Sequence, residues 1–406
     1  MPIFIVRPKR PLTHQLASVM TTTLAIPARK GRLDEITDLR TQDPIHLDIG
    51  KWVRESDENA VRELASPETD TRITGTRLLE MSQAEADKLK RDLPDALVIP
   101  DQPLELIQPQ KIEGSVKDSV TDDDLWHIER VGLRAARKNG YRGTGAGTRV
   151  AVLDSGIDPH PEVADRVDSA WSLDVPTWKV SPVTPTKDTQ GHGTHVAGII
   201  AGKTIGIAPG ASLINVIMLP RGFGKLSDFI LAMEWVGGQL DPPVQIVNMS
   251  AGLRGYLPEM QEPVAALLTA GILPVFAIGN EGRNNTRSPG NYKDLLSVGS
   301  SSRNDRVSAF SGGGTIIADS HQYTVPDLVA PGEDIYSCKM GGGYDAARGT
   351  SEATPIVSGI ACLVLERYPH IEVPALVDEL LHACQNIGEA PDRQGQGVIQ
   401  ITPALA

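Results

Sequence analysis

Short, almost wholly apolar runs recur along this 406-residue chain after residue 125, and they constrain its fold more than any other feature. Each run has the length of a strand, and the intervals between runs are long enough for helices. Runs that are apolar at every position are typical of strands buried on both faces of a parallel sheet. The predicted fold class is therefore α/β, with a mostly parallel sheet flanked by helices. The strand candidates are residues 150–153, 213–217, 246–249, 272–277 and 296–298.

The chain before about residue 120 is more polar and shows few strand signals until its end. Ser82 and Glu85 have the spacing of a capping box, which predicts a helix over about residues 83–93. Residues 97–99 and 3–6 are strand candidates. A smaller α+β domain is therefore predicted ahead of the sheet.

Residues 113–124 are polar and charged, and they include three consecutive aspartates. Such a segment is typical of an exposed linker, and it is a candidate cleavage zone. The predicted organisation is an N-terminal domain over residues 1–112, this linker, and an α/β domain over residues 125–406.

Composition excludes several classes of partner. The formal net charge of −12 gives no basic surface for nucleic acid, and no apolar run approaches the roughly 20 residues that span a bilayer. We therefore expect no nucleic acid and no membrane as partner. The three cysteines are odd in number and far apart, which does not suggest a disulfide framework. The N-terminus makes a poor signal peptide, so the cytoplasm is slightly favoured and secretion is the alternative.

Three glycine-flanked motifs carry the chemistry of a serine hydrolase. They place Asp154 after the first predicted strand, His192 in a Gly-His-Gly-Thr-His motif, and Ser351 after a Gly-Thr pair. A serine hydroxyl needs a neighbouring base, which His192 can supply before it returns the proton to a leaving amine. Asp154 would hold the imidazole in the useful tautomer. Each residue alone is most often a cap or a turn residue, but the joint pattern favours a catalytic triad.

Asn280 is a fourth catalytic candidate. It follows the predicted strand over residues 272–277, at the edge of the sheet where functional side chains gather. Its amide could donate a hydrogen bond to a developing oxyanion together with the backbone N–H of Ser351. Ser351 should open a helix, and Pro355 is expected within the first turn of that helix.

These motifs, together with Asn248-Met249-Ser250 and Gly279-Asn280-Glu281-Gly282, resemble those of the subtilisin-like serine proteases from about residue 125 to the C-terminus. The resemblance implies a serine endopeptidase that cuts a polypeptide substrate through an acyl-enzyme on Ser351. It implies no redox cofactor and no catalytic metal.

The resemblance also identifies the segments that would bind substrate. An extended substrate would pair its backbone with a strand on either side, and glycine permits the close approach. The side chain of the substrate would enter a pocket near Glu281, which hints at tolerance of basic or polar residues. The predicted binding residues are Gly222, Phe223, Gly224, Ser250, Ala251, Gly252, Ala277 and Gly279.

The second half of the N-terminal region resembles the inhibitory pro-domain of the same family. There such a domain assists folding, lays its tail in the active-site cleft and is cut off by the enzyme. The predicted partner of the site is therefore this chain's own N-terminal domain, and cleavage is expected between about residues 107 and 124. The first half is longer than a simple pro-domain requires, which leaves recruitment of a partner or substrate as an alternative.

Two positions depart from the family pattern. Glu352 follows the nucleophile where the family usually has methionine, and its carboxylate could oppose oxyanion formation, raise the pKa of His192 or select basic substrate residues. The segment over residues 201–206 is shorter than the calcium-binding loop that relatives have at this place, although Glu162 resembles one of the calcium ligands of those relatives. Calcium is therefore not favoured. A His192–His195 metal pair is rejected because no third ligand accompanies it.

Two alternative functions remain open from the sequence. A chain that keeps the fold but is silenced by Glu352 or by its N-terminal domain would bind peptides without cutting them. A transpeptidase or macrocyclase would use the same nucleophile, with an amine in place of water as the acyl acceptor.

Overall fold

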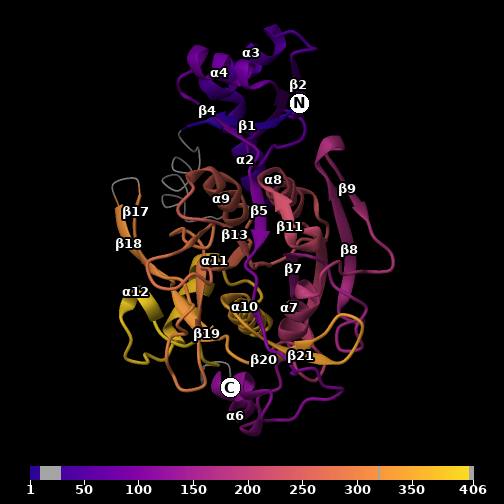
Figure 1. Ribbon diagram of the computed structural model, residues 1–406, viewed down its shortest axis with the longest axis vertical. Coiled ribbons are helices and arrows are strands. Elements are labelled where there is room, and N and C mark those ends of the chain that lie inside the picture. The colour runs from indigo at the N-terminus through magenta and orange to yellow at the C-terminus, as the bar shows by residue number, and fades with distance from the viewer. Residues whose placement is uncertain (10–28, 319–320, 402–406) are drawn as a thin grey trace.

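The computed structural model describes residues 1–9, 29–318 and 321–401, and a sheet of eight strands forms the centre of its larger unit (Figure 1). The spatial order of the strands is β19-β16-β14-β12-β7-β10-β8-β9. Every neighbouring pair is parallel except β8 and β9, so the predicted mostly parallel α/β sheet is confirmed. The strands are β7 (Arg149–Asp154), β8 (Val167–Asp174), β9 (Lys179–Pro182), β10 (Ser212–Ile217), β12 (Ile246–Met249), β14 (Leu273–Ala277), β16 (Leu296–Ser301) and β19 (Leu328–Pro331).

Helices cover both faces of this sheet, and β7 shows how one strand serves two cores. Val150 and Val152 lie in the core that includes residues of α7 (His192–Ala201) and α10 (Thr350–Arg367). Ala151 and Leu153 lie in the core that includes residues of α8 (Leu226–Glu234) and α9 (Gln261–Thr269). Alternate side chains point to opposite faces, so a strand covered on both sides must be apolar throughout.

All five strands expected from the apolar runs are present, whereas β8, β9 and β19 were not expected. β8 is only partly buried along most of its length, so its sequence lacks a continuous apolar run. β19 is short and ends at Pro331. The sheet therefore extends beyond the strands that hydrophobic runs reveal.

Smaller elements complete the larger unit. They are α5 (Trp126–Arg130), α6 (Leu133–Lys138), η1 (Val175–Thr177), η2 (Pro220–Gly222), β11 (Phe223–Lys225), η3 (Trp235–Gln239), β13 (Ala251–Arg254), η4 (Pro258–Met260), β15 (Arg287–Ser288), β17 (Gly314–Ala318), β18 (His321–Val325), β20 (Ile335–Cys338), β21 (Tyr344–Arg348), α11 (Val373–His382) and α12 (Pro391–Gln394).

The N-terminal unit is an antiparallel sheet with helices, at one end of the long axis in Figure 1. Its strand order is β2-β3-β1-β4. The predicted helix is confirmed as α4, and the Ser82 hydroxyl accepts the Glu85 N–H at 3.2 Å. The elements are β1 (Ile3–Pro8), α2 (Arg29–Gln42), α3 (Pro44–Glu55), β2 (Val61–Ala65), β3 (Arg77–Met81), α4 (Gln83–Asp92) and β4 (Ala96–Pro100).

The expectation of few strands in the first part of this unit was wrong, because β2 and β3 were missed. β2 carries charged residues at its centre, and it is held by pairing with β3 rather than by its own hydrophobicity. A strand that is stabilised mainly by pairing with its neighbours shows little strand signal in its own sequence.

The two faces of the N-terminal sheet have different neighbours. Phe4 and Val6 of β1 belong to a core shared with α3 and α4. Ile5 and Leu78 belong to the core that the main sheet shares with α8 and α9. The N-terminal sheet is therefore packed on the larger unit through one full face.

The segment predicted as a linker is mostly exposed, and its three consecutive aspartates are paired, two with residues of the larger unit and the third with Lys117 of the segment itself. The Asp122, Asp123 and Asp124 carboxylates lie 2.9, 2.8 and 2.6 Å from Arg134, Arg303 and Lys117. Just before it, β6 (Gln110–Lys111) pairs with β21. Exposed ion pairs of this kind contribute little each, about 0 to 1 kcal/mol. Among the described residues, no helix has the length and apolar character needed to cross a bilayer.

Candidate active site

Asp154 and His192 meet where β7 ends and α7 begins. Nδ1 of His192 lies 2.9 Å from both carboxylate oxygens of Asp154, and both side chains are buried. Gly193 allows this approach, since a Cβ on it would lie 2.0 Å from the Gly156 carbonyl oxygen. A neutral imidazole in this position donates from Nδ1 and leaves Nε2 free to accept a proton.

Asp188 organises this corner, and the sequence did not single it out. One of its carboxylate oxygens accepts from the Ser155 hydroxyl at 2.8 Å and from the Gly191 N–H at 2.9 Å. The other accepts from the N–H and the hydroxyl of Thr194 in the first turn of α7. An aspartate shortly before a helix is a capping signal, and it could have been found.

Ser351 lies in the first turn of α10, but its hydroxyl forms no hydrogen bond with His192. Oγ donates to Oε2 of Glu352 at 2.9 Å. Nε2 of His192 is buried and has no hydrogen-bond partner within the described part of the chain. The structure thus brings the predicted nucleophile and base into one region without joining them by a hydrogen bond.

The ionisable groups here are strongly perturbed. Burial raises the pKa of Glu352 to about 7, although His192 opposes this effect. Burial lowers the pKa of His192, but the charge of Asp154, its hydrogen bond and the charge of Glu352 outweigh burial and raise that pKa to about 9. Strong perturbation by burial and specific charges is typical of functional sites.

Asn280 is oriented by Thr350, another residue that the sequence did not single out. The N–H and the hydroxyl of Thr350 donate to Oδ1 of Asn280 at 2.8 and 3.0 Å. Because the backbone N–H can only donate, Oδ1 must face Thr350 and Nδ2 must face away. Nδ2 donates to the carbonyl of Gln108 at 3.1 Å.

The start of α10 differs from expectation at Pro355. The helix begins at Thr350, so Pro355 lies beyond the first turn, and the expectation for its position was wrong. Pro355 has no N–H to donate to the carbonyl four residues earlier, which belongs to Ser351. That carbonyl is within 3.4 Å of the Ser250 hydroxyl, which donates to it.

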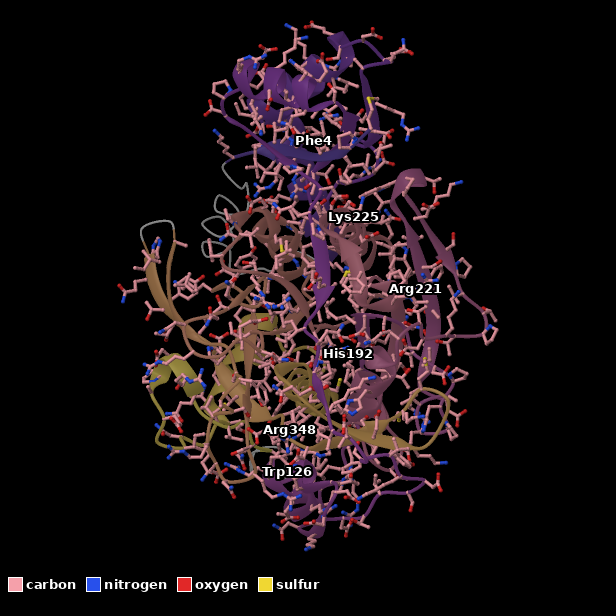
Figure 2. All side chains as sticks on the ribbon, viewed as in Figure 1. Phe4, Trp126, His192, Arg221, Lys225 and Arg348 are labelled. Carbon is pink, nitrogen blue, oxygen red and sulfur yellow. The ribbon has the colours of Figure 1, made fainter. Side chains whose placement is uncertain are left out.

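A strand of this chain's own N-terminal region lies between the two predicted substrate-binding segments. β5 (Pro103–Leu106) pairs antiparallel with β11 on one side and with β13 on the other. Leu104 faces Gly224, Glu105 faces both Phe223 and Gly252, and Leu106 faces Ala251. Figure 1 shows β5 descending from the N-terminal unit, and Figure 2 labels His192 beside the segment that follows.

The segment after β5 makes hydrogen bonds with Ser250, Asn280 and Gln190. The Ile107 N–H donates to the Ser250 carbonyl at 2.9 Å, and the carbonyl of the following residue, Gln108, accepts from Nδ2 of Asn280. The Gln108 side chain accepts from Gln190 at 3.2 Å, and it lies over Gly222, where a Cβ would be 2.9 Å from its Nε2. β6 then continues along β21.

Comparison with known proteins identifies the family. The model of the subtilase family matches residues 145–397. The chain belongs to the subtilase family. It is 32% identical to subtilisin Savinase of Lederbergia lenta over 69% of this chain and 97% of that protein. It is 33% identical to subtilisin E of Bacillus subtilis over 68% of this chain and 70% of that protein. A thermostable alkaline protease of Halalkalibacterium halodurans is 30% identical over 79% of this chain and 80% of its own length. The subtilase is accordingly a serine-type endopeptidase.

The predicted pocket residues of this subtilase surround a buried ion pair. Gly279 has a φ of 116°, and a Cβ on it would lie 2.7 Å from Oε2 of Glu281. Arg287 donates to Oε1 of Glu281 at 2.6 and 2.8 Å, and Ala277 ends β14 just before these residues. Because Arg287 neutralises Glu281, this carboxylate gives no basis for a preference for basic substrates.

The calcium prediction can be compared with the contacts of Glu162. Its Oε1 accepts from the hydroxyls of Thr204 and Tyr344, and its Oε2 accepts from the Thr204 N–H. Both oxygens are therefore engaged, and no group of three or more His, Cys, Asp or Glu side chains in the described ranges could hold a metal ion. Glu162 does not fit a calcium ligand in this arrangement. His195 lies against the Asp345 carbonyl at 3.3 Å.

Proposed function

We propose that this subtilase hydrolyses peptide bonds through an acyl-enzyme on Ser351 and that its N-terminal domain regulates it. One observation carries the proposal. An extended peptide, β5, lies between β11 and β13. The carbonyl of Gln108, two residues after β5, accepts a hydrogen bond from the Asn280 side chain. A polypeptide substrate that paired in the same way would present a carbonyl to the same amide.

The roles of the four residues follow from their chemistry. Ser351 Oγ attacks the carbonyl carbon while its proton passes to Nε2 of His192, and Asp154 stabilises the imidazolium that forms. The Asn280 amide and the Ser351 N–H, which has no acceptor within its own helix, would stabilise the oxyanion. His192 then gives the proton to the leaving amine. Water releases the acyl group by the same steps in reverse order.

Regulation by the N-terminal domain is supported by buried polar contacts between the two units. The carboxylate of Glu234 in α8 accepts the N–H groups of Ile73 and Thr74, the latter at 2.8 Å. Arg40 of α2 lies 2.9 Å from Glu262 of α9, and their side chains are 3% and 4% exposed. Separation of the units would break all of these contacts together, and they hold the N-terminal unit in one position on α8 and α9.

The peptide bond nearest the side-chain amide of Asn280 joins Gln108 to Pro109. Its nitrogen carries the proline ring, which crowds the approach of His192 to the leaving nitrogen. A strand in this register would occupy the site while resisting cleavage. Self-cleavage in residues 110–124 would need the chain to shift register or a second copy to act.

A fluorophosphonate probe tests the proposal on the full-length chain, because its phosphorus reacts only with the hydroxyl of an activated serine, which it phosphonylates with loss of fluoride. We expect labelling of Ser351 by intact-mass analysis and none in the Ser351→Ala variant, which is the matched control. Absence of labelling at every pH and after long incubation would support a silenced peptide-binding protein instead. With a peptide substrate, products joined to an added amine would support the transpeptidase alternative, and hydrolysed products would support the protease.

A further inference from the structure

The immediate neighbour of the nucleophile is a buried carboxylate that contacts the reacting atom. Glu352 is fully buried, and its Oε2 accepts the Ser351 hydroxyl at 2.9 Å. The triad mechanism has no use for this contact, because it needs the same proton to go to His192. Two acceptors therefore compete for one hydrogen.

The contact lies beside the oxyanion amide. A Cβ on Gly349 would be 2.6 Å from Oε2 of Glu352, 2.7 Å from Oγ of Ser351 and 3.0 Å from Nδ2 of Asn280. These three atoms thus converge on a single point next to Gly349. A negative carboxylate placed there opposes the negative charge that develops on the substrate carbonyl.

Three buried polar atoms of this region have no hydrogen-bond partner in the described part of the chain. They are Nε2 of His192, Nδ1 of His195 and Oε1 of Glu352, and the last two lie 3.8 Å apart. Buried polar atoms normally find partners, so this arrangement is a resting state with unmet hydrogen-bonding capacity rather than a fully satisfied one. Rotation of Ser351 Oγ towards His192 would satisfy Nε2 and release Oε2.

We propose that Glu352 is a catalytic residue that restrains Ser351: its buried carboxylate accepts the hydrogen bond of the Ser351 hydroxyl, which therefore does not donate to His192. The inference rests on the proposed function, since a restrained nucleophile matters only in an enzyme that uses it. It names a determinant of rate and pH dependence within the same site.

The charges around the pair fix the sign of the effect. Ionised Glu352 raises the pKa of His192, so that pKa should fall when the charge is removed. The other titratable groups come from β7, from the loop before α7, from α7 itself and from β21, and none of them changes in the variants below. They are Asp154, Asp188, His195 and Asp345.

The size of the effect can be estimated. A unit charge several ångströms away in a protein interior shifts a pKa by roughly one unit or more. If the pKa of His192 falls by one unit, the neutral fraction of the imidazole at pH 7 rises about tenfold. Loss of the competing acceptor adds to this gain.

The test uses the full-length chain and two variants, Glu352→Gln, which keeps the shape, and Glu352→Met, which suits a buried apolar site. Titration of ¹³C-labelled histidine by NMR follows the His192 signal, identified by its loss in a His192→Gln chain. We expect the midpoint to fall by roughly one pH unit in both variants. Fluorophosphonate labelling of Ser351 at pH 7 should become about tenfold faster or more.

Two controls separate this effect from general ones. Glu162→Gln removes a buried carboxylate whose partners are Thr204 and Tyr344, and it should leave the His192 midpoint unchanged. Glu352→Asp keeps the charge on a shorter side chain, so the midpoint should stay near its original value while the contact with Oγ is lost.

The outcomes are decisive. An unchanged His192 midpoint in both folded variants overturns the inference, as does slower labelling in both, which would mean that Glu352 assists Ser351. If Ser351 reacts in none of the chains at any pH, the proposed function fails, while the His192 titration still decides whether Glu352 controls the base.

Discussion

The buried pair between Arg40 and Glu262 gives a quantitative test of how the N-terminal unit is held. Its two side chains are 3% and 4% exposed, and the guanidinium nitrogen lies 2.9 Å from the carboxylate. Arg40→Met removes one charge and leaves the buried carboxylate without this partner. Removal of one member of a buried pair costs about 3 to 5 kcal/mol. When the units separate, water solvates the Glu262 carboxylate on α9, so the substitution raises the free energy of the docked state only. The population of the separated state should therefore rise about 10²- to 10⁴-fold.

Hydrogen exchange measures this population directly. The N–H groups of Ile73 and Thr74 donate to Glu234 across the interface, so they should exchange faster in Arg40→Met by that factor. Amides within β1 and β3 should keep their rates, because those strands pair inside the N-terminal unit.

The matched control is Arg62→Ala. Arg62 forms a pair with Glu80 at 2.8 Å on the surface of the same unit, with 59% of the Arg62 side chain exposed. An exposed pair contributes at most about 1 kcal/mol, so exchange at Ile73 should change less than tenfold. Equal acceleration in the two variants would refute the claim that the buried pair holds the interface, and acceleration throughout β1 and β3 would mean unfolding rather than separation.

Three further outcomes follow from the same contacts. Asn280→Ala should lower kcat for peptide hydrolysis about 10²- to 10³-fold, the loss that removal of one oxyanion-hole donor causes, and an unchanged kcat would remove Asn280 from the oxyanion role. Pro109→Ala should speed self-cleavage after Gln108, seen as a new mass that disappears when Ser351→Ala is added; continued resistance would mean that the proline ring does not protect the bond. Burial raises the pKa of Asp327 to about 7, so its charged form is disfavoured in the folded state and stability falls as pH rises from about 4 through 7. Asp327→Asn should therefore raise Tm more at pH 8.5 than at pH 4, and an equal gain at both values would contradict the assignment.

Much of the site was predictable because its residues stand at fixed points of a repeating architecture. Asp154 and Asn280 follow strands of a parallel sheet, and the carboxyl ends of such strands meet at one edge. His192 and Ser351 each stand near the start of a helix. The local sequence therefore predicts that these four residues lie near the edge of the sheet where its strands end.

The orientation of the same residues was not predictable. The choice of Ser351 Oγ between His192 and Glu352 is a choice of rotamer, and it depends on which acceptor lies closer in the packed site. Thr350 acts through hydrogen bonds to Asn280, which is 70 positions away in sequence. A pairing over such a separation has no local signature, and the same holds for β3, which pairs with β1 at the start of the chain.

In the proposed function and the further inference, the N-terminal strand and Glu352 restrain the nucleophile by independent means. β5 and the segment that follows it occupy the positions that substrate would need, and they are held by contacts as distant as α2 on α9. The Ser351–Glu352 contact joins adjacent residues of one helix and involves no residue of the N-terminal unit. Removal of the strand would therefore open the site but leave the hydroxyl on the carboxylate, whereas protonation or displacement of Glu352 would free the hydroxyl in a site that is still occupied. Because neither change accomplishes the other, full activity requires both.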